Sequence, residues 1–149
     1  MTPKQRAERA AQAMWDQDRA SPFLGLDLEE VDEGSARISM KVADHHANGH
    51  GMCHGGIIFT LADSAFAFAC NSRNQSTVAY HNSITYVAPA ARGDILQANA
   101  REISLTRKNG IYDVEVTNQD GTLIAQFRGM SRAIRGQLFD EDDHQNPAS

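Results

Sequence analysis

Polar and hydrophobic residues alternate strictly between residues 35 and 42. The apolar positions are Ala36, Ile38, Met40 and Val42. This period of two predicts a strand with one buried face and one face in water. Residues 57–71 are instead apolar almost all round, which predicts a helix that other elements surround. Small apolar residues three and four positions apart among helix formers predict a peripheral helix over residues 4–19.

Turn residues divide the rest of the chain into further strands. Ser21 and Pro22 are predicted to end the first helix, before a short strand over residues 23–31. Four strands in an antiparallel meander follow the central helix, over residues 77–87, 94–105, 112–116 and 122–134. The sequence Lys108-Asn109-Gly110 predicts a hairpin, because Asn-Gly tolerates the positive φ angles of a type I′ turn.

The phase of the alternation predicts how two of these strands are built. One face of the strand 77–87 is predicted to carry Val78, Tyr80, Ile84 and Tyr86. In the strand 94–105 the apolar positions change phase after Ala100, and we therefore expect a β-bulge near Arg101.

The order of elements predicts an α+β fold in which an antiparallel sheet carries one buried helix on its face. Residues 1–136 contain no linker and no internal repeat, so we expect a single domain that includes the N-terminal helix. The acidic and polar residues 137–149 are expected to form a disordered tail.

Charge and cysteine content narrow the classes of function. A net charge of −5 does not resemble the basic footprint of a nucleic-acid binder, so no nucleic-acid partner is expected. No segment approaches the roughly 20 apolar residues that span a bilayer, and the first residues are charged where a signal peptide is apolar. Cys53 and Cys70 lack disulfide or zinc spacing. We therefore expect free thiols, no membrane partner and a cytoplasmic protein.

Gly55 and Gly56 lie just before the buried helix. The first N–H groups of a helix have no partner within it, and the helix dipole places about half a positive charge there. Such an end binds a carbonyl oxygen or an oxyanion, although the glycines are equally compatible with a tight loop.

Asp63 is the one acidic residue within the helix. Its helical neighbours include Phe59 and Phe66, and an ionised carboxylate in such surroundings is costly unless it is paired or hydrogen-bonded. Asp63 either bonds a neighbouring group or serves as a general base or nucleophile. It follows Gly55 by eight residues, about 12 Å along a helix, so one helix cannot present both groups to one carbonyl carbon. We therefore predict a symmetric dimer in which Asp63 of one copy lies near Gly55 of the other.

Other arrangements of reactive residues are weaker. His46, His50 and His54 are four residues apart, but the glycines between them argue against one helical face of metal ligands, so no metal is expected. Cys53 and His54 are adjacent and point apart in an extended chain. The glycines match neither a dinucleotide fingerprint nor a P-loop, and no cofactor is expected.

The stretch NGHGMCHGGIIFTLAD, with Asn48, His54, Gly55, Gly56 and Asp63, resembles the signature of hotdog-fold acyl-CoA thioesterases of the phenylacetate-degradation type. The resemblance extends through ADSAFAFACNS, ITYVAPAARGD and NGIYDVEVTNQDGTLIAQFRGMSR and covers about residues 24–134. It implies the hotdog fold, in which an antiparallel sheet wraps around a central helix.

The resemblance also implies roles for individual residues. The Gly55 amide would polarise the thioester carbonyl, Asn48 would orient the reacting groups and His54 would support the turn. Asp63 of a second copy would activate water or attack the carbonyl itself. Candidate acyl contacts are Gly56, Phe59, Phe66 and Tyr86, and candidate coenzyme A contacts are Arg92, Arg107 and Lys108.

The expected substrate is phenylacetyl-CoA or a ring-hydroxylated relative, hydrolysed to the free acid and coenzyme A. The alternatives are a broad medium-chain acyl-CoA thioesterase, a non-catalytic acyl-CoA binding module and a hotdog dehydratase, although the Asp and His pair expected of a hydratase is missing. The resemblance further implies that two dimers associate into a homotetramer.

Overall fold

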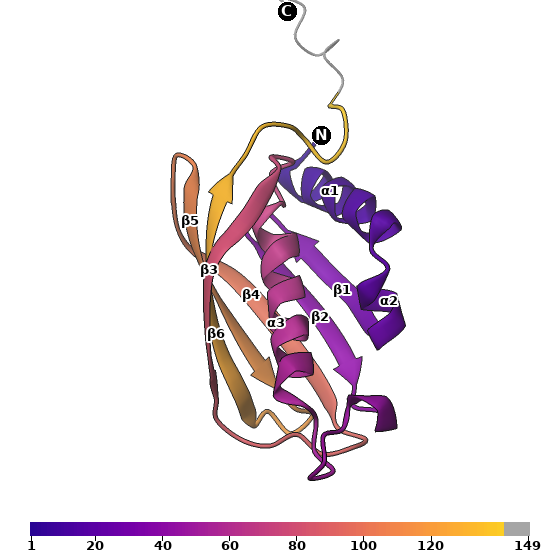
Figure 1. Ribbon diagram of the computed structural model, residues 1–149. Coiled ribbons are helices and arrows are strands. Elements are labelled where there is room, and N and C mark those ends of the chain that lie inside the picture. The colour runs from indigo at the N-terminus through magenta and orange to yellow at the C-terminus, as the bar shows by residue number, and fades with distance from the viewer. Residues whose placement is uncertain (142–149) are drawn as a thin grey trace, which may run out of the picture.

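The computed structural model describes residues 1–141, in which a six-stranded antiparallel sheet wraps around one long helix (Figure 1). The elements are α1 (Pro3–Gln17), α2 (Ala20–Leu24), β1 (Leu26–Asp32), β2 (Ser35–Lys41), the 3-10 turn η1 (Asp44–His46), α3 (Gly55–Cys70), β3 (Thr77–Tyr86), β4 (Ile95–Thr106), β5 (Asn109–Thr117) and β6 (Leu123–Ala133). Helix α3 lies across the face of the sheet, and α1 and α2 lie beside it over β1. This confirms the predicted α+β class and hotdog fold.

The core lies between α3 and the sheet. Helix α3 turns its small residues Ala62, Ala65 and Ala69 inward, which allows its backbone to approach the strands closely, while Leu61 is also fully buried. The apolar positions predicted for the strand over residues 35–42, namely 36, 38, 40 and 42, are buried as expected. Of the polar face predicted to lie in water, Ser39 is buried as well, and Lys41 is exposed.

The strand order differs from the predicted meander. The sheet runs β1-β2-β4-β5-β6-β3, so β3 pairs with β6 at one edge and has no contact with β4 in the ladder. The place next to β4 is taken by β2, through apolar pairs such as Ile38 with Ala98 and Met40 with Leu96. β3 therefore crosses to the free side of β6, where it forms an edge of the sheet.

The predicted strand over residues 23–31 begins too early. Residues 20–24 form the short helix α2, and Phe23 is 81% exposed. The Asp18 carboxylate accepts hydrogen bonds from the backbone N–H and the hydroxyl of Ser21, and Pro22 is tolerated in a first helical turn. Gly25, at φ 78°, ends α2, and β1 starts at Leu26.

The hairpin between β4 and β5 turns at different residues from those predicted. Thr106 pairs with Asn109, so the two turn residues are Arg107 and Lys108, and Arg107 carries the positive φ of 52°. Gly110 lies within β5, where an added Cβ would come 2.7 Å from Ser131 Oγ. The glycine there allows close packing and does not form the turn. The bulge predicted near Arg101 is confirmed between Glu102 and Ser104.

A bulge that the sequence did not predict changes the faces of β3. The register shifts between Ala79 and His81. Tyr86 pairs with the inward Ala125, whereas Val78 pairs with Arg132, whose guanidinium lies over the Tyr80 ring. The first half of β3 thus turns Val78 and Tyr80 outward, and only its second half faces α3.

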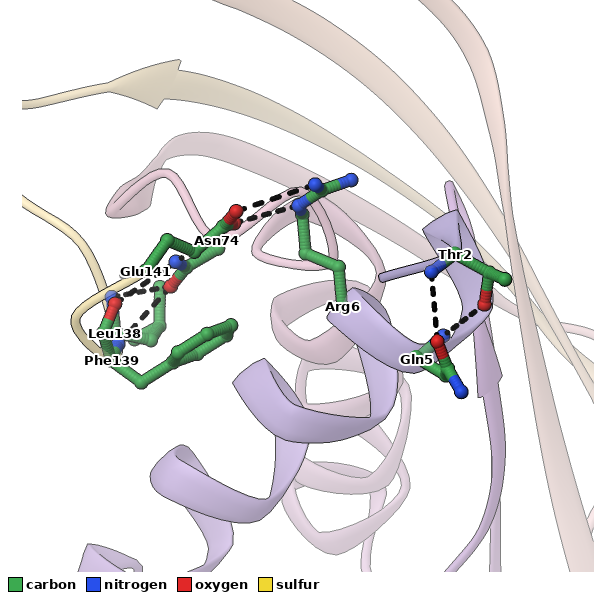
Figure 2. A network of polar contacts seen from close by, with 7 residues as sticks. All are labelled: Thr2, Gln5, Arg6, Asn74, Leu138, Phe139 and Glu141. Atoms are coloured by element: carbon green, nitrogen blue, oxygen red, sulfur yellow. Dashed lines mark hydrogen bonds and ion pairs between the residues drawn. The ribbon is translucent and has the colours of Figure 1, made fainter. Parts of the chain in front are cut away.

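The first residues of the predicted tail cross the end of α1 (Figure 2). Asn74, buried and at φ 62°, accepts hydrogen bonds from the backbone N–H groups of Leu138 and Phe139, and Arg6 pairs with Glu141 at 2.6 Å. Arg9 lies over the Phe139 ring. These contacts hold residues 138–141 against α1, while residues 142–149 of the predicted tail lie outside the described residues.

Candidate active site

The glycine loop before α3 is folded by Asn48. Its side-chain oxygen accepts hydrogen bonds from the N–H groups of His50 and Met52, and its own N–H donates to the Met52 carbonyl. Within residues 1–141 the Asn48 side-chain NH₂ group has no acceptor. Asn48 therefore shapes the loop with its oxygen and keeps two donors for a ligand.

His54 caps α3 and occupies one of the two glycine N–H groups at the start of the helix. Its Nδ1 accepts a hydrogen bond from the N–H of Gly56 at 2.9 Å, and its carbonyl accepts those of Ile57 and Ile58. The Gly55 N–H, in contrast, has no acceptor in the part of the chain that the structure describes. Gly56 thus has no free amide to offer, and the free donor at the positive end of α3 belongs to Gly55.

Tyr86 of β3 closes one side of this end. Its hydroxyl donates to the Gly55 carbonyl at 2.8 Å, and a Cβ added at Gly55 would lie 3.1 Å from Tyr86 Cζ. Asn48, Gly55, Ile58 and Tyr86 line one cavity of about 310 Å³. We call this cavity the Gly55 half-site.

Asp63 lies two turns further along α3. One carboxylate oxygen, Oδ1, accepts a hydrogen bond from the Asn82 side-chain NH₂ of β3 at 3.3 Å. Burial raises the pKa of the Asp63 carboxyl above its ordinary value, and the bond from Asn82 offsets part of that rise. A carboxylate in this state is suited to accept a proton or to attack a carbonyl near neutral pH.

Asp63 opens onto a different cavity from the Gly55 half-site. This cavity, the Asp63 groove, has a volume of about 500 Å³ and lies between α3, α1 and the C-terminal segment. Its lining is Ala13, Met14, Gln17, Asp18, Asp63, Ser64, Ala67, Phe68, Gln137 and Leu138. One chain therefore holds the two groups in two separate cavities.

The three aromatic residues predicted to contact the acyl group do not share a cavity in one chain. Phe66 lies in the core between Tyr112 and Phe127, with its ring so close to Gly129 that an added Cβ there would lie 2.7 Å from it. Phe59 packs edge-on against Phe127. Only Tyr86 reaches a candidate site, where it contacts Gly55.

The three predicted coenzyme A contacts lie at opposite ends of the sheet. Arg92 pairs with Asp44 at 3.2 Å, and its guanidinium approaches Gly51 in the glycine loop. Arg107 and Lys108 form the β4–β5 hairpin at the far end of the sheet (Figure 1). Only Arg92 is therefore close to the Gly55 half-site of its own chain.

His46 and the two cysteines have structural surroundings. The ring of His46 is buried, with Nδ1 bonded to the N–H of Ala43 and Nε2 to the Leu24 carbonyl. Burial raises the pKa of the Cys53 thiol to about 11, and burial together with the Asp63 charge raises that of Cys70 to about 12. Neither thiol is a thiolate near neutral pH.

Residues 1–141 contain no cluster of three or more His, Cys, Asp or Glu side chains that could hold a metal. Nor does any helix in this range have the length and apolar character needed to cross a membrane.

Asn82 is the contact that the sequence reasoning missed. It stands at an inward position of β3, in period with Ile84 and Tyr86. An amide in the same period as the apolar positions 78, 80, 84 and 86 is the signal that could have identified it.

Comparison with known proteins places the chain in a family. The family model described as "Thioesterase superfamily" matches residues 50–125. Acyl-coenzyme A thioesterase PaaI of Escherichia coli (strain K12) is 40% identical over 136 residues, which are 91% of this chain and 97% of the relative.

Solved structures agree with this assignment. The structure of the E. coli PaaI protein from the phenylacetic acid degradation operon matches with a TM-score of 0.90 and 40% identity over 91% of this chain and 99% of that one. A Streptococcus mutans protein solved with acetyl CoA bound matches with a TM-score of 0.74 and 28% identity over 77% of this chain and 93% of that one. With the sequence match, the fold and the free amide at the start of α3 all in agreement, this chain belongs to the thioesterase superfamily.

Proposed function

We propose that the chain is an acyl-CoA thioesterase, which hydrolyses an acyl-CoA to the free acid and coenzyme A. The observation that carries the proposal is the free Gly55 N–H at the first turn of a 16-residue helix, in a cavity that also holds the free donors of Asn48. A thioester carbonyl oxygen that accepts the Gly55 N–H gains a donor aimed at the negative charge it develops during hydrolysis.

Each site residue then has a distinct task. The Gly55 amide polarises the carbonyl, Asn48 orients the thioester through its NH₂ group, and His54 fixes the helix start by occupying the Gly56 N–H. Asp63 of a second copy supplies the carboxylate that activates water or attacks the acyl carbon.

An aromatic acyl group, phenylacetyl or ring-hydroxylated phenylacetyl, is the substrate class that we propose. The Escherichia coli relative comes from a phenylacetic acid degradation operon. The Asp63 groove offers Met14, Ala67 and Phe68 to an apolar ring. Its polar residues Gln17 and Ser64 are available to a ring hydroxyl. The proposed first contact of the coenzyme A moiety is Arg92, while Arg107 and Lys108 are proposed as contacts from the other end of the sheet.

Thiol release tests this function directly. Wild-type protein is expected to release coenzyme A from phenylacetyl-CoA and hydroxyphenylacetyl-CoA with a higher kcat/KM than from medium-chain acyl-CoAs, followed with a thiol reagent. A preference for medium chains would favour the broad thioesterase instead. Failure to release thiol from any acyl-CoA, with retained binding, would leave a binding module and refute the enzyme.

The proposed assembly is a homodimer with two shared sites. Gly55 and Asp63 are eight residues apart on one helix, about 12 Å along its axis, and open onto separate cavities. The edge strand β3 exposes the outward side chains of Val78 and Tyr80, on a surface that a second copy can cover. We also propose one domain over residues 1–136, a cytoplasmic location, and association of two dimers into a tetramer.

Mixed dimers test the shared site. A chain carrying Asp63→Ala and a chain carrying Gly55→Pro are each expected to be inactive. Unfolding and refolding them together is expected to restore about a quarter of wild-type activity, because half of the dimers are mixed and each mixed dimer has one intact site. The control is each variant refolded alone. If the refolded mixture contains mixed dimers by mass spectrometry and remains inactive, the two groups do not meet across the interface.

A further inference from the structure

The second half of β3 contacts α3 at two points that mark the two catalytic groups. Tyr86 bonds Gly55, and Asn82 bonds Asp63. Four residues of strand span about 13 Å, and the eight residues from Gly55 to Asp63 span about 12 Å of helix. The spacing of the two contacts is therefore nearly the same on the strand and on the helix. The register that holds Tyr86 opposite Gly55 also holds Asn82 opposite Asp63.

Asn82 has an unused acceptor beside this contact. Its NH₂ group donates to Asp63 Oδ1, and its side-chain oxygen is buried with no hydrogen-bond partner in the described residues. Buried polar atoms are nearly always hydrogen-bonded, since an unpaired one loses its bonds to water without gaining others. A residue that only filled space on the inner face of β3 would avoid that cost by being apolar.

We propose that Asn82 is a positioning residue for hydrolysis, which holds the Asp63 carboxylate in place through its NH₂ group. This inference rests on the proposed thioesterase function and deepens it, because it makes Asp63 a general base. The Asp63 oxygen that Asn82 does not hold is left to take the proton.

The resulting step balances without any other reactant. One O–H of the water donates to the Asp63 carboxylate, so a lone pair of the water oxygen can face the acyl carbon. The new C–O bond forms as the proton passes to Asp63 and the thioester oxygen becomes an oxyanion at the Gly55 N–H of the other copy. When the intermediate collapses, the C–S bond breaks and Asp63 returns its proton to the coenzyme A sulfur.

The titratable groups around Asp63 determine whether a change in its pKa can be attributed to Asn82. α1 contributes Asp18 to the same groove, where its carboxylate bonds Ser21, and α3 contributes Cys70, whose thiol stays protonated. β3 contributes the neutral amide of Asn82. A hydrogen bond donated to a carboxylate favours the ionised form and lowers its pKa, so loss of Asn82 raises the pKa of Asp63. Asp18 and Cys70 are unchanged by that loss and do not mimic it.

The test compares kcat, KM and the pH profile of kcat for wild type, Asn82→Ala, Asn82→Asp and the control Ser83→Ala, which alters the neighbouring exposed position of β3. Asn82→Ala is expected to lower kcat at least about 10-fold with KM changed by less than about twofold, and to move the acidic limb of the profile to higher pH. Asn82→Asp keeps the shape but adds a like charge, so its acidic limb is expected to move further. Ser83→Ala is expected to match wild type.

An unmoved acidic limb in both Asn82 variants would overturn the inference, because a merely structural loss lowers rate at every pH alike. A kcat for Asn82→Ala within about twofold of wild type would do the same. Either result, with an active wild type, leaves the proposed thioesterase function standing. An inactive wild type would instead refute that function itself.

Discussion

Replacing Asp63 with asparagine is expected to lower kcat for acyl-CoA hydrolysis by about 10³-fold or more, with the dimer intact and KM nearly unchanged. The amide has nearly the size of the carboxylate and can keep a contact with Asn82, so packing around α3 is preserved. It can neither accept the water proton nor attack the acyl carbon. The measurement is steady-state thiol release beside the wild type, and near-full activity in Asp63→Asn would exclude Asp63 from the reaction.

The same substitution is expected to stabilise the protein. Burial raises the folded-state pKa of Asp63 above its unfolded value, so the contribution of Asp63 is most favourable below about pH 4, where it is protonated in both states, and is lost as the pH rises through the folded pKa. Asparagine has no charge to bury. A Tm above that of wild type is therefore expected at pH 7, with no difference at the acidic end. A lower Tm of Asp63→Asn than of wild type at pH 7 would show that the ionised Asp63 carboxylate is stabilised by its surroundings in the folded protein.

Gly55→Pro is expected to lower kcat about 100-fold or more relative to Gly55→Ala. Proline is favoured at the first position of a helix, and the extended backbone of His54 is compatible with a following proline, so α3 keeps its start. What proline removes is the Gly55 N–H. Alanine keeps that N–H but adds the same Cβ beside Tyr86, at 3.1 Å from Cζ, and is therefore the matched control.

Circular dichroism and Tm of the two Gly55 variants show whether α3 and the fold are retained. Equal activity in folded Gly55→Pro and Gly55→Ala would mean that the Gly55 N–H does not bind the reacting oxygen. The proposed oxyanion donor would then be wrong, even if thioester hydrolysis itself is observed.

The strongest periodic patterns in the sequence were sufficient to predict the fold class. The alternation in β2 and the apolar helix α3 placed both elements within two residues of their observed bounds, because burial on one side or on all sides dominates those segments. The position of β3 was not predictable in this way, since strand order depends on which edges remain free once β2 has paired with β4.

Predictions from local sequence preference were wrong where tertiary contacts favoured another structure. Asn109-Gly110 has strong turn preference, yet Gly110 is required inside β5 by the closeness of Ser131 and Tyr112. Asp63 was found from the sequence because an acid in an apolar helix is unusual in itself, and Gly55 because the first N–H groups of a helix have no partner within it. Asn82 and Tyr86 act through strand-to-helix contacts, which no pattern within either segment contains.

The matched spacing of β3 and α3 also limits how this protein can evolve. An insertion or deletion of one residue between Asn82 and Tyr86 would turn one of the two side chains to the outer face of the sheet, and so would separate its contact from α3. Length changes in a lineage of such proteins should therefore accumulate elsewhere, as in the turn around Asp120 and Gly121. New substrate preferences can then arise by substitution along α1 and residues 137–138, which line the groove without setting the spacing of the reacting groups.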